Sequence, residues 1–387
     1  MSKRIRVARV STVPFFVITQ LSAPIRALSE SGAEVVVIAS DDDLGDSMAE
    51  LDCSEYVPVH IAREINPLSD LKSLVRLISL FRQRRFDIVH STTPKAGLLC
   101  AIAGLVARVP VRLHSFTGQP WVTMSGLKRR ILKACDRVIG LLDTRCYTDS
   151  QSQRRFLVEE GIVSARKLHV LGEGSLAGVN LQRFDPSRYS VEARGELKVE
   201  LGIDQDTLVL LFVGRITKDK GVVELLEAFS GLLEAGKDVV LVMVGPYETD
   251  GETLLSRYLA DPQVASRLKL VGFTGEPERY MSIATVLCLP SYREGFGTVV
   301  IEAAAMEVPT VGTSIYGLTD AVVDGITGKL VPVGDARALQ EALLAIVEDP
   351  LVAHNLSAAA RQRAVERFDS RRYSQLLIDE YHDLLNN

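Results

Sequence analysis

Two glutamates stand eight positions apart in the stretch "REGFGTVVIEAA", residues 293–304. Glu294 belongs to a loop broken by glycines, and Glu302 lies inside an apolar run that favours a helix. A carboxylate in apolar surroundings is costly unless it accepts strong hydrogen bonds, which the two hydroxyls of a ribose would donate. Isolated glutamates are usually solvated, but this pair predicts that Glu302 meets a ribose and Glu294 other sugar hydroxyls.

The residues between the glutamates favour a ligand that approaches the backbone. Gly295 and Gly297 let N–H groups come close to a bound molecule. Thr298 begins the predicted helix, whose positive end favours anions.

A second loop, "FVGRITKDKG", carries two cations. A predicted strand ends at Gly214, and Arg215 and Lys220 follow before the helical segment "VVELLEAF". Cations at the end of a strand and the start of a helix suit a diphosphate, whose charge must be neutralised as it leaves. The alternative for these two residues alone is a solvated turn.

A third loop, "VGFTGEPERY", spans residues 271–280. Here Phe273 could present a ring face, and Thr274 backbone groups, to a nucleobase. The alternative is that both residues only pack.

These loops need strands that end at one edge of a sheet. Continuous apolar runs alternate with helix-like segments, which is typical of parallel sheets covered on both faces. We therefore predict two doubly wound α/β domains. The predicted strands cover residues 4–11, 33–40, 87–91, 111–116, 207–214, 238–245, 268–273, 286–291 and 309–313.

Length and composition agree with two folded domains. The chain has 387 residues, more than one hydrophobic core usually organises, with 47% apolar and 24% charged residues. The series of elements pauses at residues 172–190, where Gly and Ser are frequent. We predict one domain over residues 1–185, a second over 186–365, and a closing helix over 366–387.

Charge and cysteine content indicate the surroundings of the protein. Net charge is -5, yet residues 63–137 hold 14 Lys and Arg against four Asp and Glu. The five cysteines are widely spaced, which favours reduced thiols in the cytosol.

The start of the chain lacks the apolar core of a secretion signal, and no run is long enough to cross a bilayer. We expect no nucleic-acid partner.

The second half of the chain resembles glycosyltransferase family 4, the retaining enzymes of the GT-B fold. The stretches that carry the resemblance are "GRITKDKG", "VGFTG", "PSYREGFGTVVIEAAAMEVPTVGT" and "DGITGKLVPVGD", in the order and spacing of the family. The pair Glu294 and Glu302 matches its E-x7-E motif. "GVNLQRFDP" resembles the linker of the family, and the last helix resembles the one that crosses back to the first domain.

The resemblance implies a GT-B architecture, two Rossmann-like domains facing a cleft, with the acceptor bound by the first domain and the nucleotide sugar by the second. It implies that Arg215 and Lys220 hold the donor diphosphate and that Glu302 binds the ribose. Glu294 and the loop of Gly295, Phe296 and Gly297 would bind the transferred sugar.

The first half matches the family less evenly. His114, in "VRLHSFTGQPW", matches a position where many members place a histidine against donor sugar and acceptor; the alternative is a core histidine. Many members have a Gly-Gly loop after the first strand, where this chain has "STVPFFVITQ". Phe15 and Phe16 could face an apolar acceptor or be buried under the first helix.

The stretches "HSTTPKAGLL" and "HSFTGQPW" resemble the branch that builds bacterial surface polysaccharides on polyprenyl diphosphate carriers. We therefore expect a lipid-linked acceptor and a cytoplasmic protein bound peripherally to the inner face of the membrane. The basic, amphipathic segment 68–87 would meet anionic lipid, although a helix packed on the sheet would show the same pattern.

The expected reaction is transfer of a hexose or N-acetylhexosamine from a nucleotide diphosphate sugar, with UDP preferred to GDP. We expect front-face displacement with retention, and neither a metal nor a cofactor. The DxD pattern in "DDDLGD", residues 41–46, is interpreted as a solvated loop. The alternatives are a nucleotide-sugar 2-epimerase of the same fold and a non-catalytic nucleotide-sugar-binding subunit.

Overall fold

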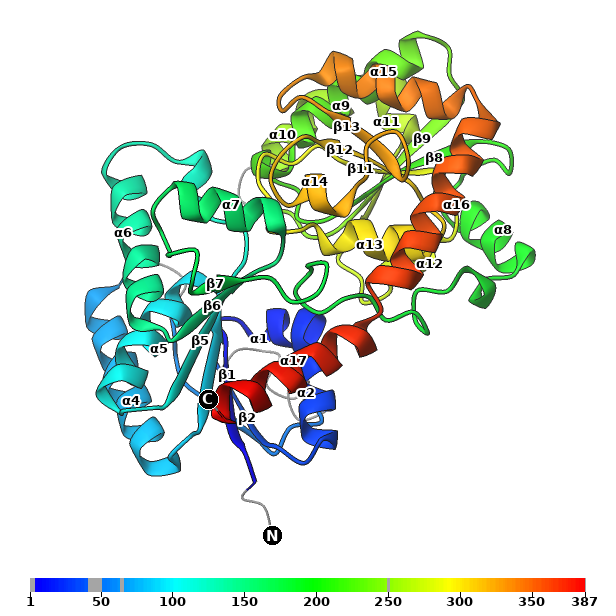
Figure 1. Cartoon of the computed structure of the whole chain (residues 1–387). Coiled ribbons are helices and arrows are strands. Elements are labelled where there is room, and N and C mark those ends of the chain that lie inside the picture. The colour runs from blue at the N-terminus through cyan, green and yellow to red at the C-terminus, as the bar shows by residue number, and fades with distance from the viewer. Residues whose placement is uncertain (1–3, 41–50, 63–65, 249–250, 387) are drawn as a thin grey trace. The chain divides into compact units, whose positions relative to one another are not determined.

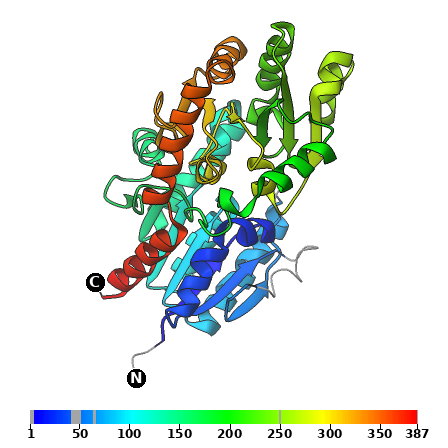
Figure 2. The same ribbon diagram turned by 90° about the vertical axis from the view of Figure 1, so that its right-hand side faces the viewer.

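Figure 1 shows the computed structural model of the chain, which describes residues 4–40, 51–62, 66–248 and 251–386. The "DDDLGD" pattern lies outside the described residues. The chain divides into two compact units. Unit 1 comprises Met1–Gly178 together with Ser370–Asn387, and unit 2 comprises Val179–Asp369. Each unit is an α/β body with its own core (Figure 2).

The sheet of unit 1 is parallel throughout its seven strands, in the order β3-β2-β1-β4-β5-β6-β7. Strand order reverses between β1 and β4. The strands are β1 (Arg6–Val10), β2 (Glu34–Ala39), β3 (Glu55–Pro58), β4 (Ile88–Thr92), β5 (Val111–Phe116), β6 (Arg145–Thr148) and β7 (Leu168–His169).

Helices cover both faces of this sheet (Figure 1). They are α1 (Pro14–Phe16), the π-helical η1 (Val17–Leu21), α2 (Ser22–Glu30), α4 (Pro67–Arg84), α5 (Pro94–Val106), the 3-10 turn η2 (Pro120–Thr123), α6 (Gly126–Leu142), α7 (Gln151–Glu159) and α17 (Ser370–Asn386). The apolar run at residues 96–107 forms α5, which packs between α4 and α6. No helix among the described residues has the length and apolarity needed to cross a bilayer.

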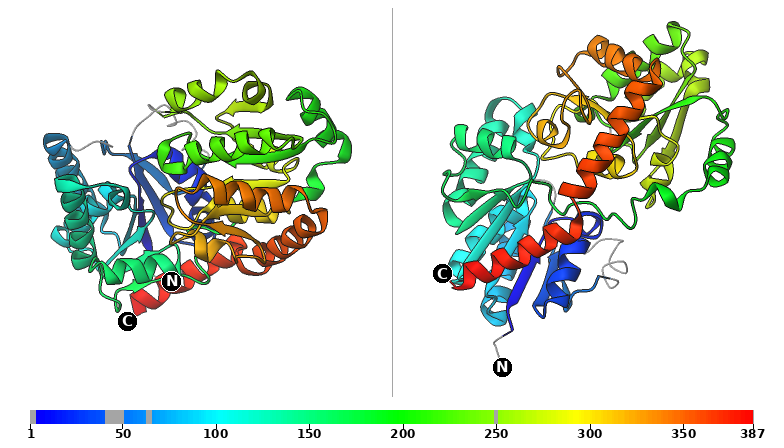
Figure 3. Two further views of the ribbon diagram at one scale, coloured as in Figure 1. Left: turned by 90° about the horizontal axis from the view of Figure 1, so that it is seen from above. Right: turned by 45° about the vertical axis from the view of Figure 1, so that its right-hand side comes forward.

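The last helix of the chain belongs to the first unit, and it lies alongside α2 (Figures 1 and 3). Polar groups dock it to the sheet. The Tyr381 hydroxyl lies 2.6 Å from Nδ1 of His90 and accepts a hydrogen bond from buried Arg9 at 2.9 Å. Glu380 accepts from Tyr147 at 2.6 Å and pairs with Arg145 at 2.5 Å.

The sheet of unit 2 is also parallel, in the order β10-β9-β8-β11-β12-β13. Its order reverses between β8 and β11. The strands are β8 (Leu208–Val213), β9 (Val239–Val244), β10 (Leu268–Gly272), β11 (Val286–Leu289), β12 (Thr310–Thr313) and β13 (Gly328–Val331). The prediction of two doubly wound α/β domains is confirmed.

Helices also cover both faces of the second sheet. They are η3 (Pro186–Arg188), α8 (Val191–Glu200), η4 (Lys218–Lys220), α9 (Val222–Glu234), α10 (Gly251–Leu259), α11 (Pro262–Arg267), α12 (Pro277–Met281), α13 (Thr298–Ala305), α14 (Leu318–Ala321), α15 (Ala336–Val347) and α16 (Pro350–Arg367). The predicted strands of both units lie within about two residues of those observed. Four short strands, β3, β6, β7 and β13, were not predicted.

The loops that leave the two central strands of unit 2 touch through a glycine. Gly221 precedes α9 with φ +68°, in the left-handed region, and a Cβ atom there would lie 2.0 Å from the Pro290 carbonyl oxygen. Only a residue without a side chain permits this approach. Gly221 therefore sets the distance between the β8 and β11 loops.

Replacing this glycine should pull the two loops apart. We expect Gly221→Ala to lower the free energy of unfolding by about 2–5 kcal/mol, the sum of left-handed strain and a steric clash. Gly236→Ala is the matched control, because Gly236 has φ +73° but open space around it, and it should cost about 1–2 kcal/mol. Equal losses in urea unfolding of the two variants would show that the close approach is unimportant.

Candidate functional site

Two of the three predicted loops follow β8 and β11, the strands between which sheet order reverses. Ligands of doubly wound sheets bind outside the carboxyl ends of the strands at this point. The β8 loop holds Arg215 and Lys220, and the β11 loop runs from Pro290 to Gly297. The fold therefore brings together two sequence segments that are separated by about 70 residues.

Lys220 and Glu294 form an ion pair across these loops. Nζ of Lys220 lies 2.5 Å from Oε1 of Glu294, and the two side chains are 19% and 13% exposed. The Ser291 hydroxyl donates to the same carboxylate oxygen at 2.8 Å. Restricted solvent makes this pair stronger than a surface salt bridge. The sequence predicted both residues but not their contact.

Four further side chains link the β11 loop to the β8 loop and to α9, and sequence reasoning did not select them. Arg293 donates from Nε to the Asp219 carboxylate at 2.9 Å. The backbone N–H of Tyr292 donates to the Asp219 carbonyl at 2.9 Å, and the Tyr292 hydroxyl donates to Glu224 at 2.5 Å. The signal available in the sequence was that these residues flank predicted site residues.

Arg215 lies at the edge of the site. Its side chain is 46% exposed and pairs with Glu248, in the loop after β9. The β8 and β9 loops also approach through backbone, since a Cβ atom on Gly245 would lie 2.0 Å from the Gly214 carbonyl oxygen. The guanidinium is thus accessible, while Gly214 serves the close approach of two loops.

The glycine loop leads into α13 as the sequence predicted. Gly297 caps this helix with φ +82°, so that Thr298 is its first residue. A Cβ atom on Gly317 would lie 2.7 Å from the Gly295 carbonyl oxygen and 2.8 Å from that of Glu294. The turn that precedes α14 therefore packs closely against the backbone of this loop.

Phe296 requires a correction. Its ring is 2% exposed and packs at 5.3 Å from the ring of Phe368 in the core of unit 2. A ring in that position stabilises the loop from inside, and only the backbone of Phe296 is available to a sugar. The apolar side chain between the two glycines packs in the core of unit 2. The motif by itself did not show this orientation.

Glu302 lies on α13 among charged groups of unit 2. Burial raises the pKa of its carboxyl to about 7, Arg183 opposes the shift, and Glu278 adds to it. When the pKa of a carboxyl group is near neutral pH, a small change in the neighbouring charges decides whether the group is ionised. Neither Arg183 nor Glu278 was predicted as a site residue.

The third predicted loop follows β10. Phe273 is 61% exposed, and the Thr274 hydroxyl accepts from the backbone N–H of Glu276 at 3.0 Å. This geometry suits a nucleobase, with the ring face of Phe273 and backbone groups beside it.

His114 also requires a correction. It lies inside β5, is 1% exposed, and packs edge-on against Phe116 with ring centroids 4.5 Å apart. Its Nδ1 lies 2.9 Å from the Ser91 hydroxyl, and burial lowers its pKa to about 3. Its surroundings are those of a core histidine, the alternative that the sequence left open, because the strand continues to Phe116 and keeps the ring away from the carboxyl edge.

The loop after β1 shows both outcomes that the sequence allowed. Phe15 is 40% exposed, whereas Phe16 packs against the apolar core beneath α2 and α17. One of the two rings is thus available on the surface. Pro14 is buried.

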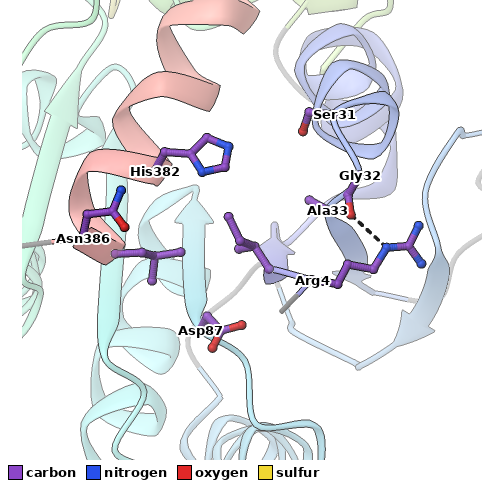
Figure 4. Close-up of a pocket in the computed structure, with 9 residues that line it drawn as sticks. Arg4, Ser31, Gly32, Ala33, Asp87, His382 and Asn386 are labelled. Atoms are coloured by element: carbon purple, nitrogen blue, oxygen red, sulfur yellow. Dashed lines mark hydrogen bonds between the residues drawn. The ribbon is translucent and has the colours of Figure 1, made fainter. Parts of the chain in front are cut away.

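The structure has a pocket of about 440 Å³ that none of these loops lines (Figure 4). It lies in unit 1 at the amino ends of the strands, lined by Arg4, Asp87, His382 and Asn386 among others. Arg4 donates to the Gly32 carbonyl across its rim at 2.8 Å. Since ligands of such sheets bind at the opposite edge, this pocket is not the candidate site.

Within the described part of the chain, no three His, Cys, Asp or Glu side chains gather where they could hold a metal ion. The charged groups of the site are instead cations and carboxylates arranged in pairs. Such an arrangement can bind an anion through Arg215 and Lys220 and hydroxyl groups through Glu294 and Glu302.

Comparison with known proteins gives matches along both units. The family described as glycosyl transferases group 1 matches residues 193–363, and the family described as glycosyl transferase 4-like domain matches residues 18–174. The capsular polysaccharide biosynthesis glycosyltransferase CapM of Staphylococcus aureus is 30% identical over 365 residues, covering 94% of this chain and 92% of that protein.

A second relative is the Escherichia coli UDP-Gal:alpha-D-GlcNAc-diphosphoundecaprenol alpha-1,3-galactosyltransferase, 27% identical over 86% of this chain and 84% of its own length. Among solved structures, a glycosyltransferase from Rickettsia africae superposes with a TM-score of 0.82 at 19% identity, each chain covered fully. Anabaena HepE with UDP and glucose gives 0.83 at 17% identity over 98% of this chain and 100% of its own. Both family descriptions and the extent of the CapM match agree with the motifs of the sequence, and the chain belongs to glycosyltransferase family 4, with the GT-B fold.

Proposed function

We propose that this glycosyltransferase moves a sugar from a UDP-linked donor to a saccharide carried on polyprenyl diphosphate, in the assembly of a surface polysaccharide. The observation that carries the proposal is the meeting of Lys220 and Glu294 at the carboxyl ends of β8 and β11. The names of the relatives support the coarser role, since CapM acts in capsule synthesis and the Escherichia coli relative uses UDP-galactose and a diphosphoundecaprenol acceptor.

In the proposed reaction the diphosphate of the donor binds Arg215 and Lys220. Both cations have carboxylate partners in the structure, so the diphosphate would exchange places with Glu248 and Glu294. Glu294 is then released to accept hydrogen bonds from hydroxyls of the transferred sugar. Glu302 accepts from the ribose, and Phe273 stacks on the base.

Bond breaking places negative charge on the departing diphosphate oxygen, which the two cations face. Preorganised groups of this kind contribute about 3 kcal/mol each to transition-state stabilisation. The acceptor hydroxyl attacks from the same side as the leaving group, its proton passes to the departing oxygen, and the anomeric configuration is retained. We propose that this charge arrangement needs no divalent metal.

Two other functions are distinguished by simple assays. A 2-epimerase of the same fold would hydrolyse or epimerise the donor with no acceptor present. A non-catalytic subunit would bind the nucleotide sugar but would transfer the sugar to none of the acceptors tested. The intact set of Arg215, Lys220, Glu294 and Glu302 favours a catalyst, because a degenerate, non-catalytic partner would be expected to lose some of it.

The two cations provide the first test. Arg215→Ala and Lys220→Ala should each lower kcat by about 100-fold, as expected for the loss of one preorganised donor, with the fold intact. Lys237→Ala is the control, because Lys237 also pairs with a carboxylate, Glu348, on the surface of unit 2. Turnover within about threefold of wild type in both site variants, by release of UDP at saturating acceptor, would reject the assignment.

Metal independence is tested separately. Because side chains neutralise the leaving group, activity should stay within about twofold after EDTA treatment. Removal of divalent ions is checked by elemental analysis of the treated protein. Complete loss that manganese restores would contradict the proposal and indicate a metal-assisted departure.

Membrane binding is proposed for the helices α4 and α6, which flank α5 in one layer. Each exposes apolar side chains among cations at the beginning of the helix. Leu68, Leu71 and Val75 are 77%, 57% and 59% exposed on α4, and Leu127 and Ile131 are 72% and 46% exposed on α6. Exposed cations in the same parts of these helices are Lys72 and Arg76 on α4, and Lys128, Arg129 and Arg130 on α6. This combination suits an anionic lipid surface.

Vesicle sedimentation tests that surface. The protein should bind vesicles containing anionic lipid and dissociate as salt rises, because such attraction is screened within about 10 Å at 0.1 M. The triple change Lys72→Gln, Lys128→Gln and Arg130→Gln should weaken binding about 100-fold, at about 1 kcal/mol for each residue.

The control for the vesicle experiment neutralises three basic residues of unit 2 instead, Lys237, Arg267 and Arg337. That variant should bind as wild type does. Equal binding of wild type to neutral and anionic vesicles would reject the membrane assignment and favour a soluble acceptor.

A further inference from the structure

Arg183 connects the first residues of unit 2 to the loop after β10. Its guanidinium donates to both oxygens of Glu278 in α12, from Nε at 2.8 Å and from a terminal nitrogen at 2.7 Å. It also donates to the carbonyl of Gly275, in the loop that presents Phe273 and Thr274. A two-point contact of this kind fixes orientation as well as distance.

Burial makes this ion pair obligatory for Glu278. The Glu278 side chain is 6% exposed, while that of Arg183 is 40% exposed and lies over the Phe184 ring at 5.1 Å. A buried carboxylate that loses its partner is strongly unfavourable. The position of α12 therefore depends on an arginine from a segment nearly 100 residues earlier in the chain.

The same pair faces Glu302 on α13, which packs against α12. Arg183 and Glu278 are the charged groups that act on the Glu302 carboxyl. The neighbouring helix α16 brings two more cations to this region, but Arg361 donates to the carbonyls of Phe184 and Ala305, and Arg363 to those of Asp320 and Ala321. Of these three described cations, Arg183 is the one that pairs with Glu278 and acts on Glu302.

We propose that Arg183 is a positioning residue of the donor site, which holds the 273–276 loop in place and supplies the positive charge that Glu302 needs to receive a ribose as a carboxylate. The inference rests on the proposed function, in which Glu302 binds the donor. Arg183 acts through Glu302 and the loop and does not touch the donor itself.

The charges give opposite effects for the two partners, which a purely structural pair would not show. Removing Arg183 leaves two carboxylates facing each other, so Glu302 takes up a proton at higher pH. Removing the Glu278 charge leaves Arg183 to favour the carboxylate, so Glu302 stays ionised to lower pH. Since the pKa of Glu302 is about 7, both changes fall in an accessible range.

The experiment measures kcat/KM for the donor between pH 5.5 and 9 at saturating acceptor. For wild type, kcat/KM should fall as pH decreases through about 7, because the protonated carboxyl accepts fewer hydrogen bonds. Arg183→Gln should move the inflection up by about one unit, raising donor KM about fivefold at pH 7 with recovery at pH 9 and kcat within about threefold. Glu278→Gln should move it down. Ionisation of the donor itself affects the pH profile of every variant equally, so it does not change the difference between their inflections.

Arg279→Gln is the matched control, because Arg279 lies on the same helix and pairs with Glu200 on the surface. Its inflection should coincide with that of wild type. Arg183→Lys should keep the wild-type inflection, since it preserves the charge, and the double variant Arg183→Gln with Glu278→Gln should return near it. If Arg183→Gln does not fold, the direction of the shift in Glu278→Gln decides.

Coincident inflections in active wild type and both single variants would overturn the role of Arg183 while leaving the proposed function intact. Absence of donor binding and turnover in wild type would instead reject the proposed function. Loss of activity at every pH in both single variants, with lowered melting temperatures, would show a merely structural pair and also overturn the inference.

Discussion

The close approach of backbone at the centre of the second sheet is the constraint on which the candidate site depends. Gly221 lets the β8 loop meet Pro290 of the β11 loop, and Gly317 lets a third segment support Glu294 from behind. Where these backbones meet, Lys220 and Glu294 come within 2.5 Å of each other. Side chains at the glycine positions would separate the loops and the charges that they carry.

Charge compensation is the second feature of the site. Lys220 pairs with Glu294, Arg215 with Glu248 and Arg183 with Glu278. Cations held in this way are already oriented, so in the proposed reaction a diphosphate would replace one set of charge-assisted bonds by another. The enzyme thereby avoids the cost of unpaired charges in a partly buried site.

Unit 1 depends on a contact between its two ends in sequence. Arg9 in the first strand and His90 in the fourth both bond to Tyr381 in the last helix. These groups are buried, and a buried polar group without a partner is costly. The final helix is therefore part of the first core, and it closes a unit whose other face carries the basic helices α4 and α6.

The sequence by itself determined the alternation of strands and helices, the two-domain architecture, the family, and the loops that hold Arg215, Lys220, Glu294 and Glu302. Strong apolar runs and glycine-containing motifs are local signals, so they can be recognised in the sequence without knowledge of tertiary contacts. The short strands β3, β6, β7 and β13 were missed because two to four residues carry too little periodicity, and three of these strands lie at sheet edges.

Tertiary structure alone decided which of the motif residues are buried and which charged residues meet. His114 and Phe296 stand in motifs, yet both are buried, because the continuation of β5 and the core of unit 2 determine their orientation. Arg183 and Glu278 carried no motif, yet they meet each other beside Glu302. A sequence pattern describes residues along one strand or helix. Ion pairs and ring contacts join side chains from different elements, and only the folded chain sets the distances between them.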